Sequence, residues 1–207
     1  MPIALESERR AGLPVVKRTE IGQTFLGAVL RVEPRDRMKK DDQTGAMVPL
    51  LKLNGKPRQE LVLTCLVLPG TNAPVGLGDD EHVPQPEEIV RLILKGKAFA
   101  DWLQSKADLP DGRPVNVGDI VKQVTDRAQV YDANGNPSGA ELTDQAAVNA
   151  VPRGRSIGIY GPITVRAPKE GSPWVAKAEA AYHSLQEPIV AESDLPPEPP
   201  DDDEPPF

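Results

Sequence analysis

Proline and glycine occur so often in this sequence that few of its helices and strands can be long. The chain of 207 residues holds 23 prolines and 17 glycines, and both residue types interrupt helices and strands. Hydrophobic residues make up 39% of the chain, which is enough for a packed core. We therefore expect one domain of short elements joined by frequent turns, with at least one stretch that does not fold.

The negative charge of the chain is concentrated at its C-terminal end. The formal net charge is −7, yet residues 191–207 hold seven acids and no lysine or arginine. The remaining 24 acids balance all 24 lysines and arginines, so the body is neutral. This asymmetry is typical of an interaction tail. Because the tail has little apolar content to offset the entropy cost of ordering, we expect residues 188–207 to be disordered.

Hydrophobic patterns predict five strands and one main helix in the body. Strands are expected at about 24–33, 48–53, 59–68, 117–131 and 156–166, with the dipeptide Asn54-Gly55 as a hairpin turn. A glycine inside the first strand favours a bend or bulge. Apolar residues at spacings of three and four predict a helix over 86–106, and a short helix is expected near 175–185. Residues 1–20 carry mixed charge and are expected to form a flexible arm.

The order strand, strand, strand, helix, strand, strand predicts a mainly β domain over residues 21–187. A five-stranded barrel with a helix between strands three and four is the plan of the OB-fold, a common oligonucleotide-binding scaffold. Other small barrels give similar patterns, and the order of elements does not by itself establish a function.

The last seven residues form an acidic tip. The residues that we expect to bind a partner protein are Asp201, Asp202, Asp203, Glu204, Pro206 and Phe207. A terminal aromatic ring, a terminal carboxylate and flanking acids suit a small apolar pocket with a basic rim.

This tip resembles that of bacterial single-stranded DNA-binding proteins, where three Asp residues precede one apolar residue and a terminal Pro-Phe. Phage single-stranded DNA-binding proteins also end in acidic tails with a terminal Phe. Here Glu and Pro stand where the bacterial tip has its apolar residue. The resemblance implies a phage-type or bacterial-type protein that binds and protects single-stranded DNA and recruits replication, recombination or repair proteins.

Single-strand binders need cations that follow the phosphates and rings on which the bases stack. Basic residues cluster on the first predicted strand and its loop, around the Asn-Gly hairpin and before the last strand, near the expected groove of an OB-fold. Phe99 and Trp102 are expected in the core, whereas Phe25 and Trp174 suit either core or groove. The candidate DNA-binding residues are Arg31, Arg35, Arg37, Lys39, Lys40, Lys52, Lys56, Arg58, Tyr131, Arg153, Arg155 and Tyr160.

Other chemistry finds little support in the sequence. Cys65 lies alone in an apolar run and is expected in the core, and His82 and His183 lie in no metal-ligand motif. The sequence shows no phosphate-cradling loop and no histidine paired with a nucleophile, so we expect no enzyme activity, cofactor or metal. No segment suits a membrane span or a signal peptide, which predicts a cytoplasmic protein, in the host cytoplasm if the chain is phage-encoded.

Two alternatives stay open. An adaptor without DNA affinity could mimic the host tip and capture host replication or repair proteins, although this function leaves the basic loops unused. A nuclease or recombinase with scattered acids would be revealed by activity on labelled DNA with Mg²⁺.

Overall fold

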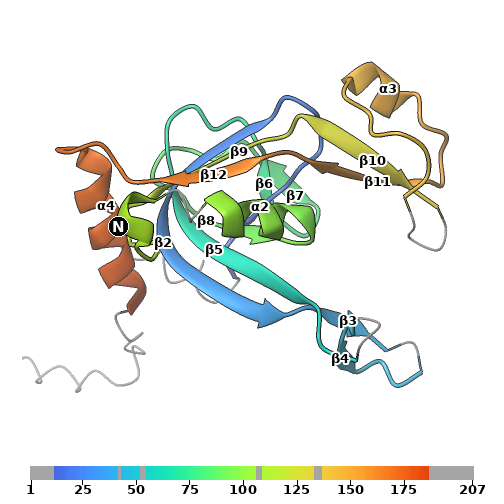
Figure 1. Ribbon diagram of the computed structural model, residues 1–207, viewed down its shortest axis with the longest axis horizontal. Coiled ribbons are helices and arrows are strands. Elements are labelled where there is room, and N and C mark those ends of the chain that lie inside the picture. The colour runs from blue at the N-terminus through green and yellow to red at the C-terminus, as the bar shows by residue number, and fades with distance from the viewer. Residues whose placement is uncertain (1–11, 42, 52–54, 106–108, 133–136, 187–207) are drawn as a thin grey trace, which may run out of the picture.

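The computed structural model describes residues 12–41, 43–51, 55–105, 109–132 and 137–186. Strands outnumber helices among them, which confirms the prediction of a mainly β protein. Figure 1 shows helix α4 (Pro173–Gln186) at one end of the molecule and two long β arms that extend from the other end.

An eight-stranded sheet forms the centre of the fold, in the order β12-β9-β2-β5-β8-β1-β6-β7. Its first five strands are β12 (Ile163–Arg166), β9 (Ile120–Val124), β2 (Thr24–Asp36), β5 (Gln59–Val67) and β8 (Ile89–Leu94), each antiparallel to the next. Beyond them lie β1 (Val15–Val16), β6 (Val75–Leu77) and β7 (Asp80–His82). β1 runs parallel to β8 and antiparallel to β6.

The sheet is open, so the closed five-stranded barrel expected from the sequence is not observed. β8 pairs with β1 on the side away from β5, and the strand order ends at β12. Helix α2 (Lys97–Ser105) packs against β12, where the Ser105 hydroxyl accepts a 2.8 Å hydrogen bond from the Val165 N–H. This contact satisfies a backbone donor at the sheet edge that would otherwise need another strand or water.

Two apolar clusters hold the sheet and helices together. The larger joins the sheet to α2 and includes Phe25, Cys65 and Trp102, which confirms that Cys65 and Trp102 are core residues. Phe99 packs against the same cluster. The smaller cluster joins the sheet to α4, and Trp174 packs against it. Trp174 therefore belongs with the core of the body.

A β-bulge in β2 lies just after the glycine that predicted a bend. The register with β5 shifts between Val29 and Arg31, three residues beyond Gly27. Gly27 itself allows close packing, because a Cβ there would lie 2.9 Å from the Cys65 Cβ and 2.9 Å from the Phe25 ring. The bulge thus lies within a few residues of the position that the sequence predicted.

The predicted helix over 86–106 is wrong in its first half. Ile89–Leu94 forms strand β8, and α2 begins only at Lys97. Val90, Leu92 and Leu94 are fully buried at every second position, which is the period of a strand. Ile89, Leu92 and Ile93, at spacings of three and four, also fit one face of a helix, but the β-branched residues of the run favour the strand. Gly96, at a φ of 54°, then turns the chain into α2.

Several other predicted elements differ in extent. The predicted strand 48–53 overlaps strand β4 (Met47–Pro49), which pairs with β3 (Met38–Lys40). Residues 52 and 53 lie outside the described residues. The predicted strands 117–131 and 156–166 are each divided, into β9 and β10 (Arg127–Tyr131) and into β11 (Ser156–Tyr160) and β12. Strand β1 belongs to the sheet although the sequence predicted a flexible arm there. The helix near 175–185 is confirmed as α4.

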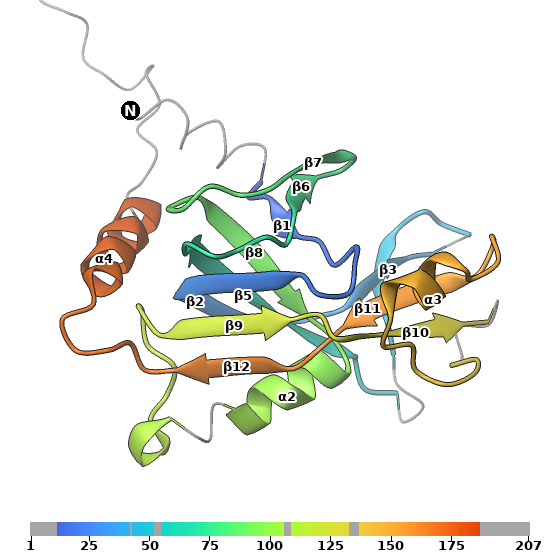
Figure 2. The ribbon, with the colours of Figure 1, turned by 90° about the horizontal axis from the view of Figure 1, so that it is seen from above.

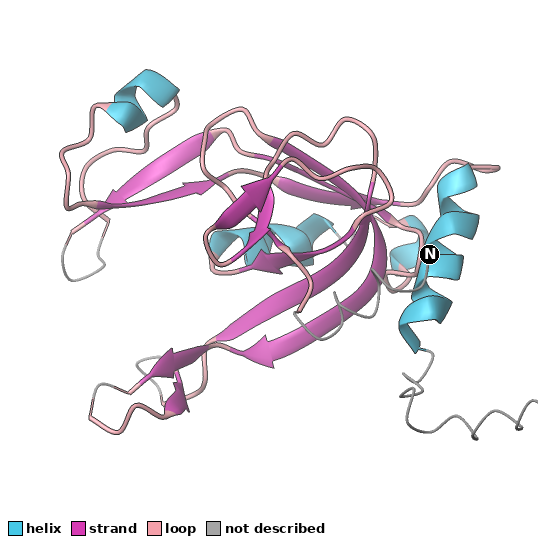
Figure 3. Cartoon of the chain, turned by 180° about the vertical axis from the view of Figure 1, so that it is seen from behind, coloured by secondary structure: helices cyan, strands magenta, loops and turns pink. Residues whose placement is uncertain are grey.

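Two β arms extend from the same end of the sheet. We call residues 35–41, 43–51 and 55–60 the first arm, which contains the outer ends of β2 and β5 and the ribbon β3–β4. We call residues 127–132 and 137–160 the second arm, which contains β10, β11 and the short helix α3 (Gln145–Asn149). Figures 1 and 2 show the arms pointing the same way, and Figure 3 shows α2 between them from behind.

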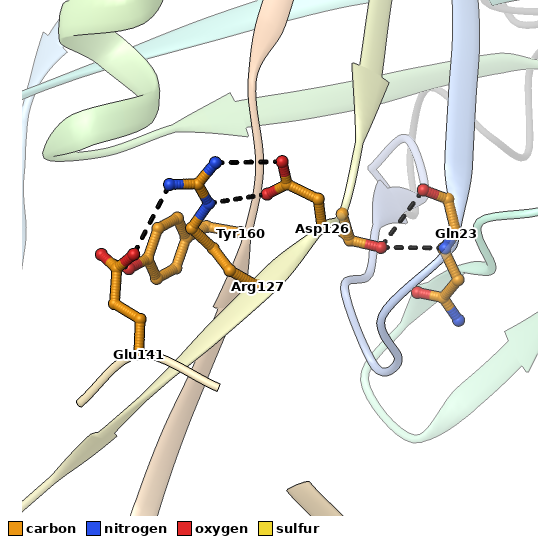
Figure 4. A network of polar contacts seen from close by, with 6 residues as sticks. Gln23, Asp126, Arg127, Glu141 and Tyr160 are labelled. Atoms are coloured by element: carbon orange, nitrogen blue, oxygen red, sulfur yellow. Dashed lines mark hydrogen bonds and ion pairs between the residues drawn. The ribbon is translucent and has the colours of Figure 1, made fainter. Parts of the chain in front are cut away.

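A rigid joint sets the direction of the second arm. At Gly161, between β11 and β12, a Cβ would lie 1.8 Å from the Val124 carbonyl oxygen, so no larger residue fits without moving the backbone. On the neighbouring strand, the Thr125 hydroxyl accepts a 2.9 Å hydrogen bond from the Gln23 N–H, and the Thr125 N–H donates to the Gln23 carbonyl over 2.9 Å. Figure 4 shows Gln23 at this joint. The second arm is thus anchored to the start of β2.

Candidate nucleic-acid interface

A cleft of about 550 Å³ lies between the two arms where they meet the sheet. The first arm contributes Arg37 to its lining, and the second arm contributes Tyr131, Glu141 and Tyr160. Arg18, after β1, and Lys95, between β8 and α2, complete the charged part of the lining. The cleft therefore has cations on one wall and floor and two aromatic rings on the other wall.

The tyrosines come from adjacent strands of the second arm. Tyr131 is the last residue of β10, and Tyr160 is the last residue of β11. The Tyr131 ring lies over Gly158, because a Cβ on this glycine would be 3.0 Å from the ring carbon Cε2. The structure thus brings both predicted stacking residues into one cleft, and Gly158 makes room for one of them.

A polar network fixes Tyr160 (Figure 4). Its hydroxyl donates a hydrogen bond to the Glu141 carboxylate. Arg127 lies 3.5 Å from the same carboxylate and also forms a two-pronged ion pair with Asp126, at 2.8 and 3.0 Å. Desolvation, with the hydrogen bond and charge of Glu141, raises the pKa of Tyr160 to about 12. The phenol is therefore neutral at physiological pH, which suits stacking against a base.

The first arm carries the predicted cluster of cations on its surface. Lys39, Lys40 and Arg58 are exposed, whereas Arg37 is half-buried and lines the cleft. Backbone hydrogen bonds of 2.7 Å link the Arg37 N–H to the Arg58 carbonyl and the Leu50 N–H to the Arg37 carbonyl. These bonds fix the base of the β3–β4 ribbon, so the side chains of Lys39 and Lys40 project from an ordered strand pair.

Two more cations were predicted around the Asn-Gly hairpin, and the structure describes one of them. Lys56 is exposed and has an interaction partner. Lys52 lies outside the described residues.

Arg35 forms an ion pair with a buried carboxylate. Its Nε donates a 2.7 Å hydrogen bond to Glu60, whose side chain is only 7% exposed. Lys95 lies 3.3 Å from the other oxygen of the same carboxylate. Glu60 therefore neutralises part of the charge of these two cations. Arg35 connects the first arm to the body as well as contributing positive charge.

Arg37 is the one predicted cation in the described lining of the cleft. The predicted cations outside the first arm lie elsewhere. Arg31 pairs with Glu33 over 2.7 Å and lines a separate hollow that also includes Tyr182 of α4. Arg153 and Arg155 are exposed between α3 and β11, outside the cleft lining.

Asp41 has a structural role within the first arm. Its carboxylate accepts hydrogen bonds from the Gln43 N–H, at 3.0 Å, and from the Thr44 N–H, at 2.8 Å. These bonds lower the pKa of Asp41, the backbone bond from Thr44 most of all. The acid closes the turn between β3 and β4, as an Asx turn does.

Two cleft cations were missed by the sequence reasoning. Arg18 lay within the predicted flexible arm, and Lys95 lay within the predicted helix. The adjacent apolar pair of β1, Val15 and Val16, was the only local sign that the chain before Arg18 joins the sheet.

Other kinds of site receive no support from the described part of the chain. No group of three or more histidines, cysteines, aspartates or glutamates is arranged there to hold a metal ion. None of the described helices is both long and apolar enough to cross a membrane. Comparisons of the chain with known protein families, curated proteins and solved structures find no match. The predicted partner-binding tip, residues 201–207, lies outside the described residues.

Proposed function

We propose that this chain binds single-stranded DNA in the cleft between the two arms. The observation that supports the proposal best is the division of chemistry across the cleft, with Arg37 on one wall and Tyr131 and Tyr160 on the other. Cations neutralise the phosphates of a strand, and flat rings stack on its unpaired bases. A strand lying between the arms would meet both kinds of group at once. The proposal includes no catalytic step.

The plan of the sheet supports the same function. The elements β2, β5, β8, α2, β9 and β12 follow one another in the order of an OB-fold, and we propose that they form a partly open OB-like barrel. In this plan the first arm connects strands one and two, and the second arm connects strands four and five. OB-folds bind oligonucleotides with these two connections. The proposed interface thus uses the segments that line the cleft.

This interface should prefer single strands over duplex DNA. Stacking a base on an aromatic side chain contributes about 1–3 kcal/mol, and bases within a duplex are not free to stack on protein rings. The cations of the first arm would bind phosphates of either form, so they provide affinity but little selectivity. Tyr131 and Tyr160 therefore carry the preference for single strands.

Fluorescence anisotropy with a labelled oligothymidine and a duplex of equal length tests the proposal. We expect tighter binding to the oligothymidine, and the substitution Tyr131→Ala should weaken it about fivefold to hundredfold. The matched substitution Tyr182→Ala, on α4, should leave the affinity unchanged because Tyr182 lies outside the cleft. Equal affinity for the two ligands would contradict the proposal. Failure to bind any DNA at low salt would instead favour an adaptor protein.

We also propose that the acidic tip recruits proteins of replication, recombination or repair. This part rests on the resemblance of the tip to those of single-stranded DNA-binding proteins and on its charge, which suits a basic-rimmed pocket. Binding DNA with the body and a partner with the tip would bring that partner to single-stranded DNA.

A further inference from the structure

Arg18 reaches the floor of the cleft from the segment after β1. Its Nε donates a 2.9 Å hydrogen bond to the Gln123 side-chain oxygen on β9, and its Nη2 donates a 2.8 Å bond to the Ile93 carbonyl on β8. These two bonds tie the guanidinium, which lines the cleft, to strands β8 and β9 of the body. The third nitrogen, Nη1, donates to no residue in the described part of the chain.

The guanidinium of Arg18 has no carboxylate partner among the described residues. Glu141, which also lines the cleft, is already bound to Arg127 and Tyr160. Burial lowers the pKa of Arg18, because desolvation disfavours the charged form. The floor of the cleft therefore holds a desolvated positive charge.

Hydrogen-bond donors exceed acceptors around this charge. Gln123 is only 2% exposed, and its side-chain oxygen is used by Arg18. Its amide nitrogen, Nε2, is buried and has no hydrogen-bond partner in the described residues. Buried charges and buried donors are unfavourable unless an anion or acceptor pairs with them. Arg18 lines the cleft, whereas Gln123 does not, so an anionic ligand in the cleft would pair with the charge of Arg18.

The exposed cations of the first arm differ from Arg18 in this respect. Lys39 and Lys40 remain hydrated and screened by salt when no ligand is bound, so each one gains little from a single phosphate. Arg18 is already desolvated and positioned, so an anion that reaches it forms a stronger, charge-assisted hydrogen bond.

We propose that Arg18 binds one backbone phosphate of the single strand at the floor of the cleft and is the strongest single phosphate contact of the protein. This inference rests on the proposed function and adds a specific anchoring residue. The bases on either side of this phosphate would then lie level with the tyrosines of the second arm.

The variant Arg18→Met tests this inference in the full-length chain. Affinity for the labelled oligothymidine should fall about tenfold to hundredfold, because a charged hydrogen bond is lost. The slope of log affinity against log salt should fall by about 0.7, the contribution of one phosphate on a single strand. The melting temperature should stay within a few degrees of the wild-type value or rise, because the cost of burying the charge is also removed.

Arg91→Met is the matched control. Arg91 is another half-buried arginine, and its Nε and Nη2 donate to the Leu13 carbonyl at 3.1 and 2.8 Å. It lines the hollow beside Tyr182 and not the cleft. Its removal should leave both the affinity and the salt slope unchanged.

The possible results separate the two proposals. If wild-type protein binds oligothymidine and Arg18→Met keeps the same affinity and slope, the assignment of Arg18 is wrong and the proposed function stands. If wild-type protein binds no DNA, both are wrong. If Arg18→Met melts much lower, Arg18→Lys provides the readout: the retained charge should keep the slope while the affinity falls. A lower melting temperature with unchanged affinity for both variants would show a purely structural role.

Discussion

Removing the cations of the first arm should change the salt dependence of DNA binding by a predictable amount. Arg37, Lys39 and Lys40 lie on the arm, and none of the three forms an ion pair in the described part of the chain. Each side chain should neutralise one phosphate, and each phosphate contributes about 0.7 to the slope on a single strand. Replacing all three with Gln should therefore lower the slope by about 2. A tenfold rise in salt would then weaken DNA binding about a hundredfold less than it does for the wild-type protein.

Anisotropy titrations across a series of salt concentrations measure this slope. A control variant with the same charge change replaces Arg166, Lys169 and Lys177 with Gln, at the α4 end of the molecule. It should keep the wild-type slope, and both variants should melt close to the wild-type temperature because exposed charges contribute little to stability. Arg35 is left unchanged in this design because it pairs with the buried Glu60. An unchanged slope in the first-arm variant, or an equal fall of the slope in the control variant, would refute the assignment of the first arm to the DNA-binding interface.

Three further predictions concern other parts of the chain. Arg113→Ala should lower the free energy of unfolding by about 3 kcal/mol in chemical denaturation, because Asp119 is 1% exposed and would lose its two-pronged partner. Because the pKa of Tyr160 is raised, the folded protein holds this proton more tightly than the unfolded chain does. The contribution of Tyr160 to the free energy of unfolding should therefore stay constant below pH 10 and fall from pH 10 to about 12. The variant Tyr160→Phe should lack this pH dependence. Deleting Phe207 should abolish partner capture in pull-downs with little change in DNA affinity, whereas deleting residues 191–207 should also tighten DNA binding at low salt.

The sequence predicted the parts of the site that depend on neighbouring residues. A run of cations between two strand patterns is a local signal, and it predicted a basic loop that the structure shows as part of the first arm. Tyr131 and Tyr160 were found from local patterns too, since Tyr131 lies beside a loop and Tyr160 lies on the last predicted strand. Their meeting in one cleft depends on the pairing of β10 with β11, which the sequence predicted only as two separate strands.

Long-range contacts explain what the sequence could not predict. The hydrogen-bond partners of Arg18 lie 105 and 75 residues further along the chain, so no local pattern marks it as a cleft residue. The strand β8 was mistaken for a helix because Ile89, Leu92 and Ile93 fit a helical face. This segment forms a strand because it is buried on both sides, by the neighbouring strands and by α2. The bend of the second arm depends on Gly161 contacting the Val124 carbonyl across the hairpin.

The position of bound DNA is the most direct test of the account. Oligonucleotides containing 5-bromodeoxyuridine can be crosslinked to the protein by light, and the modified peptides can be identified by mass spectrometry. We predict crosslinks at Tyr131 and Tyr160 in the cleft, on the second arm, whose strands β10 and β11 are labelled in Figure 1. Crosslinks at Trp174 or Tyr182, on α4 at the opposite end of the molecule, with none in the second arm, would contradict it.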